Sequence, residues 1–136
     1  MGFLKLFSKI FKKKQRSKIL VLLVEDNPIC LKAELGIIKS LGLDLKVFVA
    51  KSGMDALKLL EENNFDFIVL DLVLPDIDGV NILKILNYSE NLKSKVVVIS
   101  ATKKDYTALA CLSLNAVAFL VKPITANDLM EIFNKP

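Results

Sequence analysis

The sequence predicts a single α/β domain whose parallel β-sheet is covered by helices on both faces. Short apolar runs bounded by turn-forming residues alternate with helical patterns five times along the chain. Four consecutive apolar residues, as in 67–70, are typical of a strand buried on both faces, which is the situation in parallel sheets. Repeated strand–helix alternation favours the same architecture. The 136 residues and 53% hydrophobic content suffice for one domain with a substantial core.

Five strands are expected. The first, third and fourth, 18–24, 67–71 and 96–99, are almost wholly apolar and should lie in the interior of the sheet. The second, 44–49, has mixed polarity and is expected at an edge. The fifth, 117–121, completes the sheet.

Capping residues predict where the helices begin and end. The predicted starts are, in chain order, Asn27 with Pro28, Ser52 with Asp55, Asp78, and Thr125 with Asp128. Gly42 and Asn115 are suited to end the first and fourth helices in the left-handed conformation. The third and fourth helices should cover about 79–88 and 104–113, and the last helix runs toward the chain end.

Polar side chains follow four of the five strands. Glu25 and Asp26 come after the first strand, Asp71 ends the third, Ser100 ends the fourth, and Lys122 follows the fifth. Because ligands of open α/β sheets bind outside the carboxyl ends of the strands, we expect these side chains to form one site. Three carboxylates in proximity repel one another strongly, so the cluster indicates a bound cation.

The residue types restrict the chemistry of this site. The chain contains no histidine, which excludes Ser-His-Asp, Cys-His and His-ligated metal sites. Carboxylates alone favour Mg²⁺ over zinc, and a carboxylate beside Mg²⁺ can act as a nucleophile toward a phosphoryl group. The ammonium group of Lys122 and the hydroxyl of Ser100 could stabilise the transferred oxygens. A metal-dependent phosphatase is disfavoured, because the sequence offers neither a general acid nor a Gly-rich phosphate loop.

These residues resemble the receiver domain of two-component response regulators over about residues 18–134. The matching positions are Glu25-Asp26, Asp71, Leu74-Pro75, Asp78-Gly79, Ser100-Ala101, Phe119 and Lys122-Pro123. The resemblance implies an α/β fold of the flavodoxin-like type, a three-layer sandwich with a five-stranded parallel sheet of order 2-1-3-4-5.

The resemblance also implies a phosphorelay function in signal transduction. The implied Mg²⁺ ligands are Glu25, Asp26, Asp71 and the backbone carbonyl of Val73. Asp71 would accept a phosphoryl group from a sensor histidine kinase or phosphotransfer protein, forming an aspartyl phosphate. Lys122 would supply the counter-charge, with Pro123 following it in cis. Ser100 and Phe119 would be the switch pair.

Phosphorylation would then change the affinity of one surface for partner proteins. This surface is formed by the fourth helix, the fifth strand and the last helix, and the sequence over 108–118 is unusually apolar. The apolar residues are explained either as core or as a face for a downstream target or a homodimer. Since no output domain follows residue 136, we expect a signalling switch, with neither an enzyme nor a DNA-binding function in this chain.

Residues 1–17 form a separate basic segment. Seven of the 19 Lys and Arg residues fall within 1–18, which has no acid, while the rest carries 12 bases and 15 acids, a net charge of −3. Apolar residues within 3–11 are spaced as in an amphipathic helix. The segment is expected to bind an anionic membrane surface; docking on a partner protein and an inert tail are the alternatives. The predicted location is cytoplasmic, peripheral at the inner membrane face.

A second hypothesis is a receiver-like adaptor that is never phosphorylated and is tethered to a membrane or scaffold by residues 1–17. The intact acidic residues argue against it. The two cysteines, Cys30 and Cys111, fall in helical patterns and are expected to be reduced and buried.

Overall fold

The computed structural model describes residues 2–6, 18–89, 93–102 and 105–134, and forms a five-stranded parallel sheet of order β2-β1-β3-β4-β5. The predicted flavodoxin-like strand order is confirmed. The strands are β1 (Ile19–Val24), β2 (Leu45–Ala50), β3 (Phe67–Asp71), β4 (Lys95–Ser100) and β5 (Ala118–Val121). The helices are α2 (Pro28–Ser40), α3 (Gly53–Glu62), α4 (Gly79–Tyr88), α5 (Asp105–Ser113) and α6 (Ala126–Phe133).

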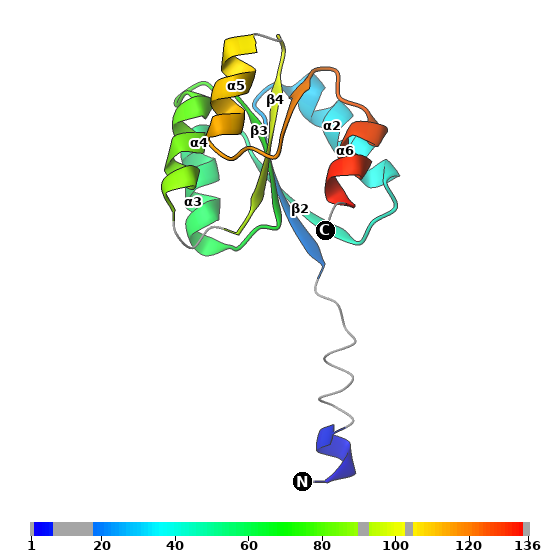
Figure 1. Ribbon diagram of the computed structural model, residues 1–136. Coiled ribbons are helices and arrows are strands. Elements are labelled where there is room, and N and C mark those ends of the chain that lie inside the picture. Colours follow the sequence, from blue (N-terminus) through cyan, green and yellow to red (C-terminus); the bar gives the residue numbers. More distant parts are fainter. Residues whose placement is uncertain (1, 7–17, 90–92, 103–104, 135–136) are drawn as a thin grey trace.

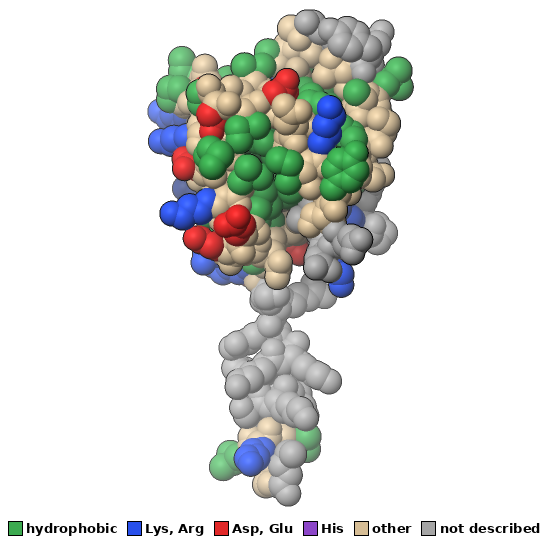
Figure 2. Space-filling view, turned by 90° about the vertical axis from the view of Figure 1, so that its left-hand side faces the viewer, with side chains coloured by type: hydrophobic (Ala, Val, Ile, Leu, Met, Phe, Trp, Pro, Cys, Tyr) green, Lys and Arg blue, Asp and Glu red, His purple; other side chains and the backbone are tan. Residues whose placement is uncertain are grey.

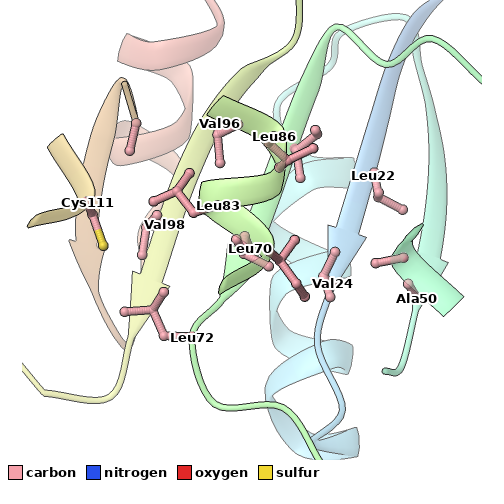
Figure 3. Packing of buried hydrophobic residues seen from close by; sticks show 14 of the residues in the cluster. Leu22, Val24, Ala50, Leu70, Leu72, Leu83, Leu86, Val96, Val98 and Cys111 are labelled. Atoms are coloured by element: carbon pink, nitrogen blue, oxygen red, sulfur yellow. The ribbon is translucent and has the colours of Figure 1, made fainter. Parts of the chain in front are cut away.

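The helices cover both faces of the sheet, with α3, α4 and α5 on one side and α2 and α6 on the other (Figure 1). Alternate residues of each central strand therefore enter different cores. In β3, Ile68 and Leu70 belong to the core under α3, α4 and α5 (Figure 3), whereas Phe67 and Val69 belong to the core under α2 and α6. Burial on both faces explains why this strand has no polar residue before Asp71.

Most predicted caps are present. Asn27 accepts hydrogen bonds from the N–H groups of Ile29 and Cys30, and Thr125 and Asp128 form a complete capping box. Asn115 has a φ of 68° after α5. Ser52 is the N-cap of α3, as predicted, and a second residue adds hydrogen bonds at the start of this helix.

Asp76, in the loop after β3, caps α3 from a distance in sequence. Its carboxylate accepts hydrogen bonds from the N–H groups of Gly53 and Met54, at 2.7 and 2.9 Å. Ser52 accepts from the N–H group of Asp55, which is one half of the expected capping box. These bonds tie the loop that follows Asp71 to the neighbouring helix.

The N-terminal segment joins the domain at the amino end of β1, opposite the edge that carries Asp71 (Figure 1). Residues 3–6 form a helical turn with exposed Phe3, Leu4 and Leu6. The remainder of the predicted amphipathic helix lies outside the described residues. None of the helices in the described ranges is long and apolar enough to cross a membrane.

Candidate functional site

Three carboxylates meet at the carboxyl edge of the sheet, as the sequence predicts. Glu25 and Asp26 follow β1, Asp71 ends β3, and these strands are hydrogen-bonded neighbours. One oxygen from each carboxylate lies within 4.8 Å of those of the other two. Glu25 and Asp71 are 0% and 4% exposed, whereas Asp26 is exposed. The cluster is thus open to solvent on the side of Asp26.

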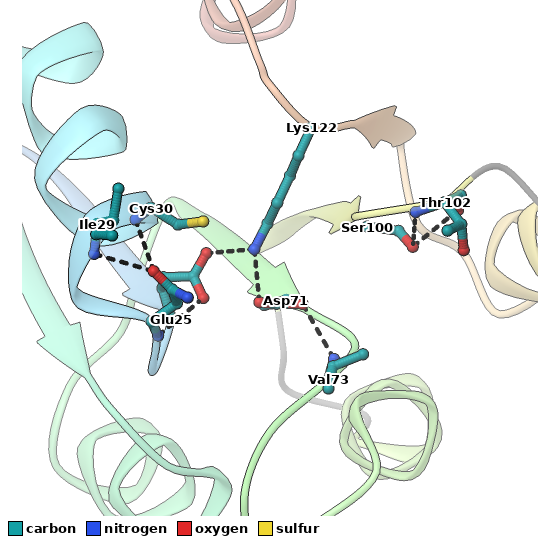
Figure 4. A network of polar contacts seen from close by, with 9 residues as sticks. Glu25, Ile29, Cys30, Asp71, Val73, Ser100, Thr102 and Lys122 are labelled. Atoms are coloured by element: carbon teal, nitrogen blue, oxygen red, sulfur yellow. Dashed lines mark hydrogen bonds and ion pairs between the residues drawn. The ribbon is translucent and has the colours of Figure 1, made fainter.

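Lys122 connects two of these carboxylates. Its Nζ atom donates hydrogen bonds to Oε1 of Glu25 at 2.5 Å and to Oδ2 of Asp71 at 2.8 Å (Figure 4). The bond between Lys122 and Pro123 is cis, as expected. The lysine approaches from beyond β5, two strands away from β3, so its position depends on the whole sheet.

The pKa values at this site reflect burial and close charges. Burial and the hydrogen bond to Glu25 raise the pKa of Asp71, against the opposing effect of Lys122. Burial would also raise the pKa of Glu25, but the nearby side chains of Asp71, Glu34 and Lys122 outweigh it and lower that pKa. Burial would lower the pKa of Lys122, but both carboxylates outweigh it and raise that pKa. The ammonium group is therefore held in its charged form.

Of the two predicted switch residues, neither forms a described hydrogen bond to Asp71. The hydroxyl of Ser100 donates to the carbonyl of Thr102 at 2.9 Å, which directs it into the loop after β4 (Figure 4). Phe119 is half-buried and pairs in register with Val98. Ser100 is two residues beyond Val98, so Ser100 and Phe119 point to the same face of the sheet.

The loop after Asp71 is tightly packed against α4. Val73 donates its N–H to Oδ1 of Asp71 at 3.0 Å. A Cβ atom on Gly79 would lie 2.5 Å from Cα of Leu72 and 2.8 Å from the carbonyl oxygen of Asp71. Only glycine permits α4 to begin this close to the phosphoacceptor candidate.

Glu34 is a fourth acid at the site and was not predicted. It lies on α2, 3% exposed, and burial followed by the proximity of Glu25 raises its pKa to about 8. Within the described chain, neither of its carboxyl oxygens has a hydrogen-bond partner. Its spacing in the helix gives no sequence signal, because a glutamate is normally read as a solvent-exposed residue.

The donor set fits a hard divalent cation. Carboxylate oxygens from Glu25, Asp26 and Asp71 are ligands that Mg²⁺ prefers, and the exposed side leaves room for the waters that Mg²⁺ retains. The clustered acids exceed the single ammonium of Lys122 in charge, so an additional cation would be attracted.

Comparison with known proteins agrees with this geometry. Residues 21–134 match the response regulator receiver domain. The chain belongs to the receiver domain family. It is 33% identical over 117 residues to the two-component response regulator ORR24 of Oryza sativa subsp. indica, covering 83% of this chain and 18% of that protein. It is 38% identical over 108 residues to protein-glutamate methylesterase/protein-glutamine glutaminase 5 of Myxococcus xanthus, covering 79% and 31%.

Among solved structures, this receiver domain is similar to that of the sensor histidine kinase PA1611 from Pseudomonas aeruginosa PAO1, which has a magnesium ion coordinated in its active site cleft. The TM-score is 0.74 and the identity 26%, covering 85% of this chain and 94% of the other. The chain spans less than a third of the two sequence relatives described above. The match therefore defines a receiver domain, and the activities of those larger proteins do not transfer with it.

Proposed function

We propose that this receiver domain accepts a phosphoryl group on Asp71 and acts as a signalling switch. The observation that carries the proposal is the position of Asp71: a buried carboxylate at the end of β3, 2.8 Å from the ammonium of Lys122 and beside two further acids. The phosphodonor is a sensor histidine kinase or a phosphotransfer protein. The domain is a substrate of that donor and a switch, not an enzyme with a substrate of its own.

Each residue has a defined task in the transfer. An oxygen of Asp71 forms the new P–O bond while the P–N bond of the donor phosphohistidine breaks, and the electron pair returns to the imidazole nitrogen. The ammonium of Lys122 lies 2.8 Å from Oδ2 of Asp71, so it would be close enough to neutralise the oxygens of a phosphoryl group on that residue. Mg²⁺ held by Glu25, Asp26, Asp71 and the Val73 carbonyl would supply the remaining positive charge.

The switch is an exchange of hydrogen-bond partners by Ser100. Its hydroxyl, bonded to Thr102 in this structure, would turn toward the phosphoryl oxygens, which are stronger acceptors than a neutral carbonyl. Phe119 lies on the same face of the sheet and would rotate into the space that Ser100 vacates. This couples the site to the surface formed by α5, β5 and α6.

The α5, β5 and α6 surface is suited to bind a protein. Exposed apolar side chains on it are Leu109 and Leu112 of α5 and Val121 of β5, which are 68%, 46% and 39% exposed. Figure 2 shows the adjoining side of the molecule, where apolar side chains gather between charged ones. The occupant is a downstream target protein or a second copy of this chain.

The experiment is phosphorylation by acetyl phosphate with Mg²⁺, followed by intact mass spectrometry. The wild-type protein is expected to gain one phosphoryl group, and the gain should disappear with EDTA and in Asp71→Asn. Asp44→Asn is the matched control, because Asp44 lies before β2 at the opposite edge of the sheet. An unphosphorylated wild-type protein would refute the proposal and favour the alternative, a receiver-like adaptor tethered by residues 1–17.

The N-terminal segment is proposed to hold the domain at an anionic membrane surface from the cytoplasmic side. Phe3 and Leu4 are 78% and 80% exposed, and the seven bases of residues 1–18 are unopposed by any acid. Apolar side chains can enter the headgroup boundary while the lysines pair with anionic lipid.

A further inference from the structure

The loop between β3 and α4 carries part of the phosphoacceptor site. Asp71 precedes this loop, and the carbonyl of Val73 is the backbone ligand of the proposed Mg²⁺ site. Val73 also donates its N–H to Oδ1 of Asp71 at 3.0 Å, so the loop backbone and the phosphoacceptor are directly connected (Figure 4). Whatever fixes the loop backbone therefore affects the geometry of the site.

The middle of this loop is held by the start of α3. Oδ1 of Asp76 accepts a hydrogen bond from the N–H group of Gly53 at 2.7 Å, and Oδ2 accepts one from Met54 at 2.9 Å. Among the hydrogen bonds described for residues 73–77, these two join the loop to an element distant in sequence. A carboxylate that is bonded through both oxygens is restrained in orientation as well as in position.

The helix side of this contact permits a close approach. Gly53 is the first residue of α3, and a Cβ atom there would lie 2.9 Å from Cβ of Ile77 and 3.2 Å from Oδ1 of Asp76. Any larger residue would push the loop away from the helix. The N-terminus of a helix favours negative charge, and the hydrogen bonds from Met54 and Gly53 lower the pKa of Asp76. The carboxylate is therefore ionised at neutral pH.

We propose that Asp76 is a positioning residue for the phosphoacceptor site, because its two hydrogen bonds to α3 hold the backbone at Val73 in the arrangement that Mg²⁺ binding requires. Without these bonds the loop would gain conformational freedom, which Mg²⁺ binding would then have to remove. Asp76 acts through the loop backbone and is not itself a ligand. The inference rests on the proposed function, in which Val73 contributes a Mg²⁺ ligand and Asp71 accepts the phosphoryl group.

The first test is the Mg²⁺ affinity of the full chain, measured by calorimetry. Asp76→Ala should bind Mg²⁺ about tenfold more weakly than the wild type. Asp76→Asn retains an acceptor oxygen for one of the two N–H groups, so its affinity should lie between those of the wild type and Asp76→Ala. Gly53→Ala should also weaken Mg²⁺ binding, because it displaces the loop from the helix side with no change in charge.

Two matched controls act on the same end of α3. Asp55→Ala removes an exposed acid from the first turn, which is the same change in charge as in Asp76→Ala, and leaves both hydrogen bonds of Asp76 in place. Ser52→Ala removes the N-cap of α3, so it reproduces the loss of a cap without releasing the loop. Both controls should bind Mg²⁺ with the affinity of the wild type. Unfolding curves establish that every variant is folded under the conditions of the assay.

Hydrogen exchange tests the position of the loop without Mg²⁺ and without phosphorylation. In EDTA, the amide of Val73 should exchange about fivefold faster or more in Asp76→Ala than in the wild type, because its hydrogen bond to Asp71 opens more often. The same amide should exchange at the wild-type rate in Ser52→Ala. This measurement separates release of the loop from a general loss of helix capping.

Phosphorylation by acetyl phosphate distinguishes a displaced loop from a damaged phosphoacceptor. Asp76→Ala should need about tenfold more Mg²⁺ for half-maximal labelling of Asp71, whereas its rate at saturating Mg²⁺ should be close to that of the wild type. The inference is overturned if Asp76→Ala binds Mg²⁺ as tightly as the wild type, or if Ser52→Ala weakens binding equally. If the wild type accepts no phosphoryl group, the proposed function fails, while Mg²⁺ affinity and hydrogen exchange still decide the role of Asp76.

Discussion

At the scale of single residues, the site is a balance between buried acids and one lysine. Lys122 provides the two described ion pairs to Glu25 and Asp71, at 2.5 and 2.8 Å, and its side chain is 17% exposed. Removing one partner of a buried ion pair leaves uncompensated charge, which is more costly than the pair itself is stabilising. The stability of the domain should therefore depend on this lysine.

We expect Lys122→Ala to lower the free energy of unfolding by about 2–4 kcal/mol in EDTA, because two buried carboxylates lose their counter-ion. Added Mg²⁺ should restore part of the loss and stabilise the variant more than the wild type. Urea unfolding with EDTA and with Mg²⁺ measures both effects. Lys18→Ala is the control, since Lys18 is 4.0 Å from Asp44 in an exposed pair. A variant as stable as the wild type in EDTA would contradict the expectation.

Glu34 should give the domain a dependence on pH. Its pKa is about 8 in the folded protein against an ordinary value of 4.5, so between these values the folded state holds a proton that the unfolded chain has released. Raising the pH in this range therefore favours unfolding, by about 1 kcal/mol per pH unit. Above pH 8 Glu34 is ionised in both the folded and the unfolded state, so it no longer contributes to the pH dependence of the free energy of unfolding.

This effect can be isolated by comparing the wild type with Glu34→Gln in urea unfolding experiments in EDTA between pH 5.5 and 7.5. In Glu34→Gln the free energy of unfolding should no longer decrease as the pH rises, whereas in the matched control Glu61→Gln, on exposed α3, it should still decrease. Equal slopes for wild type and Glu34→Gln would show that Glu34 is ionised in the folded state across this range.

The sequence predicted four of these site residues and missed Glu34. Glu25, Asp26, Asp71 and Lys122 could be predicted because each follows a recognisable strand, and parallel strands bring their carboxyl ends to one edge. Glu34 could not, because its burial depends on how α2 packs beside the loops after β4 and β5. That packing is a tertiary property which helical periodicity does not report.

At the scale of elements, the loop after β3 is fixed from both ends. Asp76 accepts hydrogen bonds from the first N–H groups of α3, and Gly79 places the start of α4 against the backbone of Leu72. The Pro and Asp-Gly pattern of this loop predicted turns correctly. It did not predict the hydrogen bonds that the Asp76 carboxylate accepts, because the donor N–H groups lie 22 and 23 residues away in sequence.

Two glycines should respond in opposite directions to replacement by alanine. Gly79→Ala would bring Cβ within 2.5 Å of backbone, so α4 or the loop must shift, and we expect a loss of about 2 kcal/mol or more. Gly36 is exposed within α2 and a Cβ there meets no atom within 4 Å. Gly36→Ala should stabilise by about 0.5–1 kcal/mol through helix propensity.

Thermal or urea unfolding of both variants tests this pair. Because Gly79 also positions the loop after Asp71, Gly79→Ala should slow labelling of Asp71 by acetyl phosphate even at temperatures where the variant is fully folded. Gly36→Ala should be labelled at the wild-type rate. A Gly79→Ala variant with unchanged stability would mean that the close approach at Leu72 is relieved without cost.

At the scale of the whole molecule, the chain has two oppositely charged parts. Residues 1–18 carry seven bases and no acid, and the remainder has a net charge of −3. The basic segment enters the domain at the amino end of β1, and Asp71 lies at the carboxyl end of the neighbouring β3. A domain held by this segment would present Asp71 on the side away from the attachment point, accessible to a phosphodonor.

Attachment to lipid can be tested by co-sedimentation with vesicles. The full chain should bind vesicles that contain anionic lipid, bind neutral vesicles much less, and dissociate as salt is raised, because each base near the surface contributes about 1 kcal/mol that salt screens. Removal of residues 1–17 should abolish binding. Phe3→Ser with Leu4→Ser should weaken it with no change in charge, since these exposed side chains would enter the headgroup boundary.

The matched control is Ile29→Ser, an equally exposed apolar residue on the domain itself, at 80%. Binding that survives removal of residues 1–17 would place the lipid contact on the domain, and binding that is equally strong on neutral vesicles would exclude the electrostatic contribution.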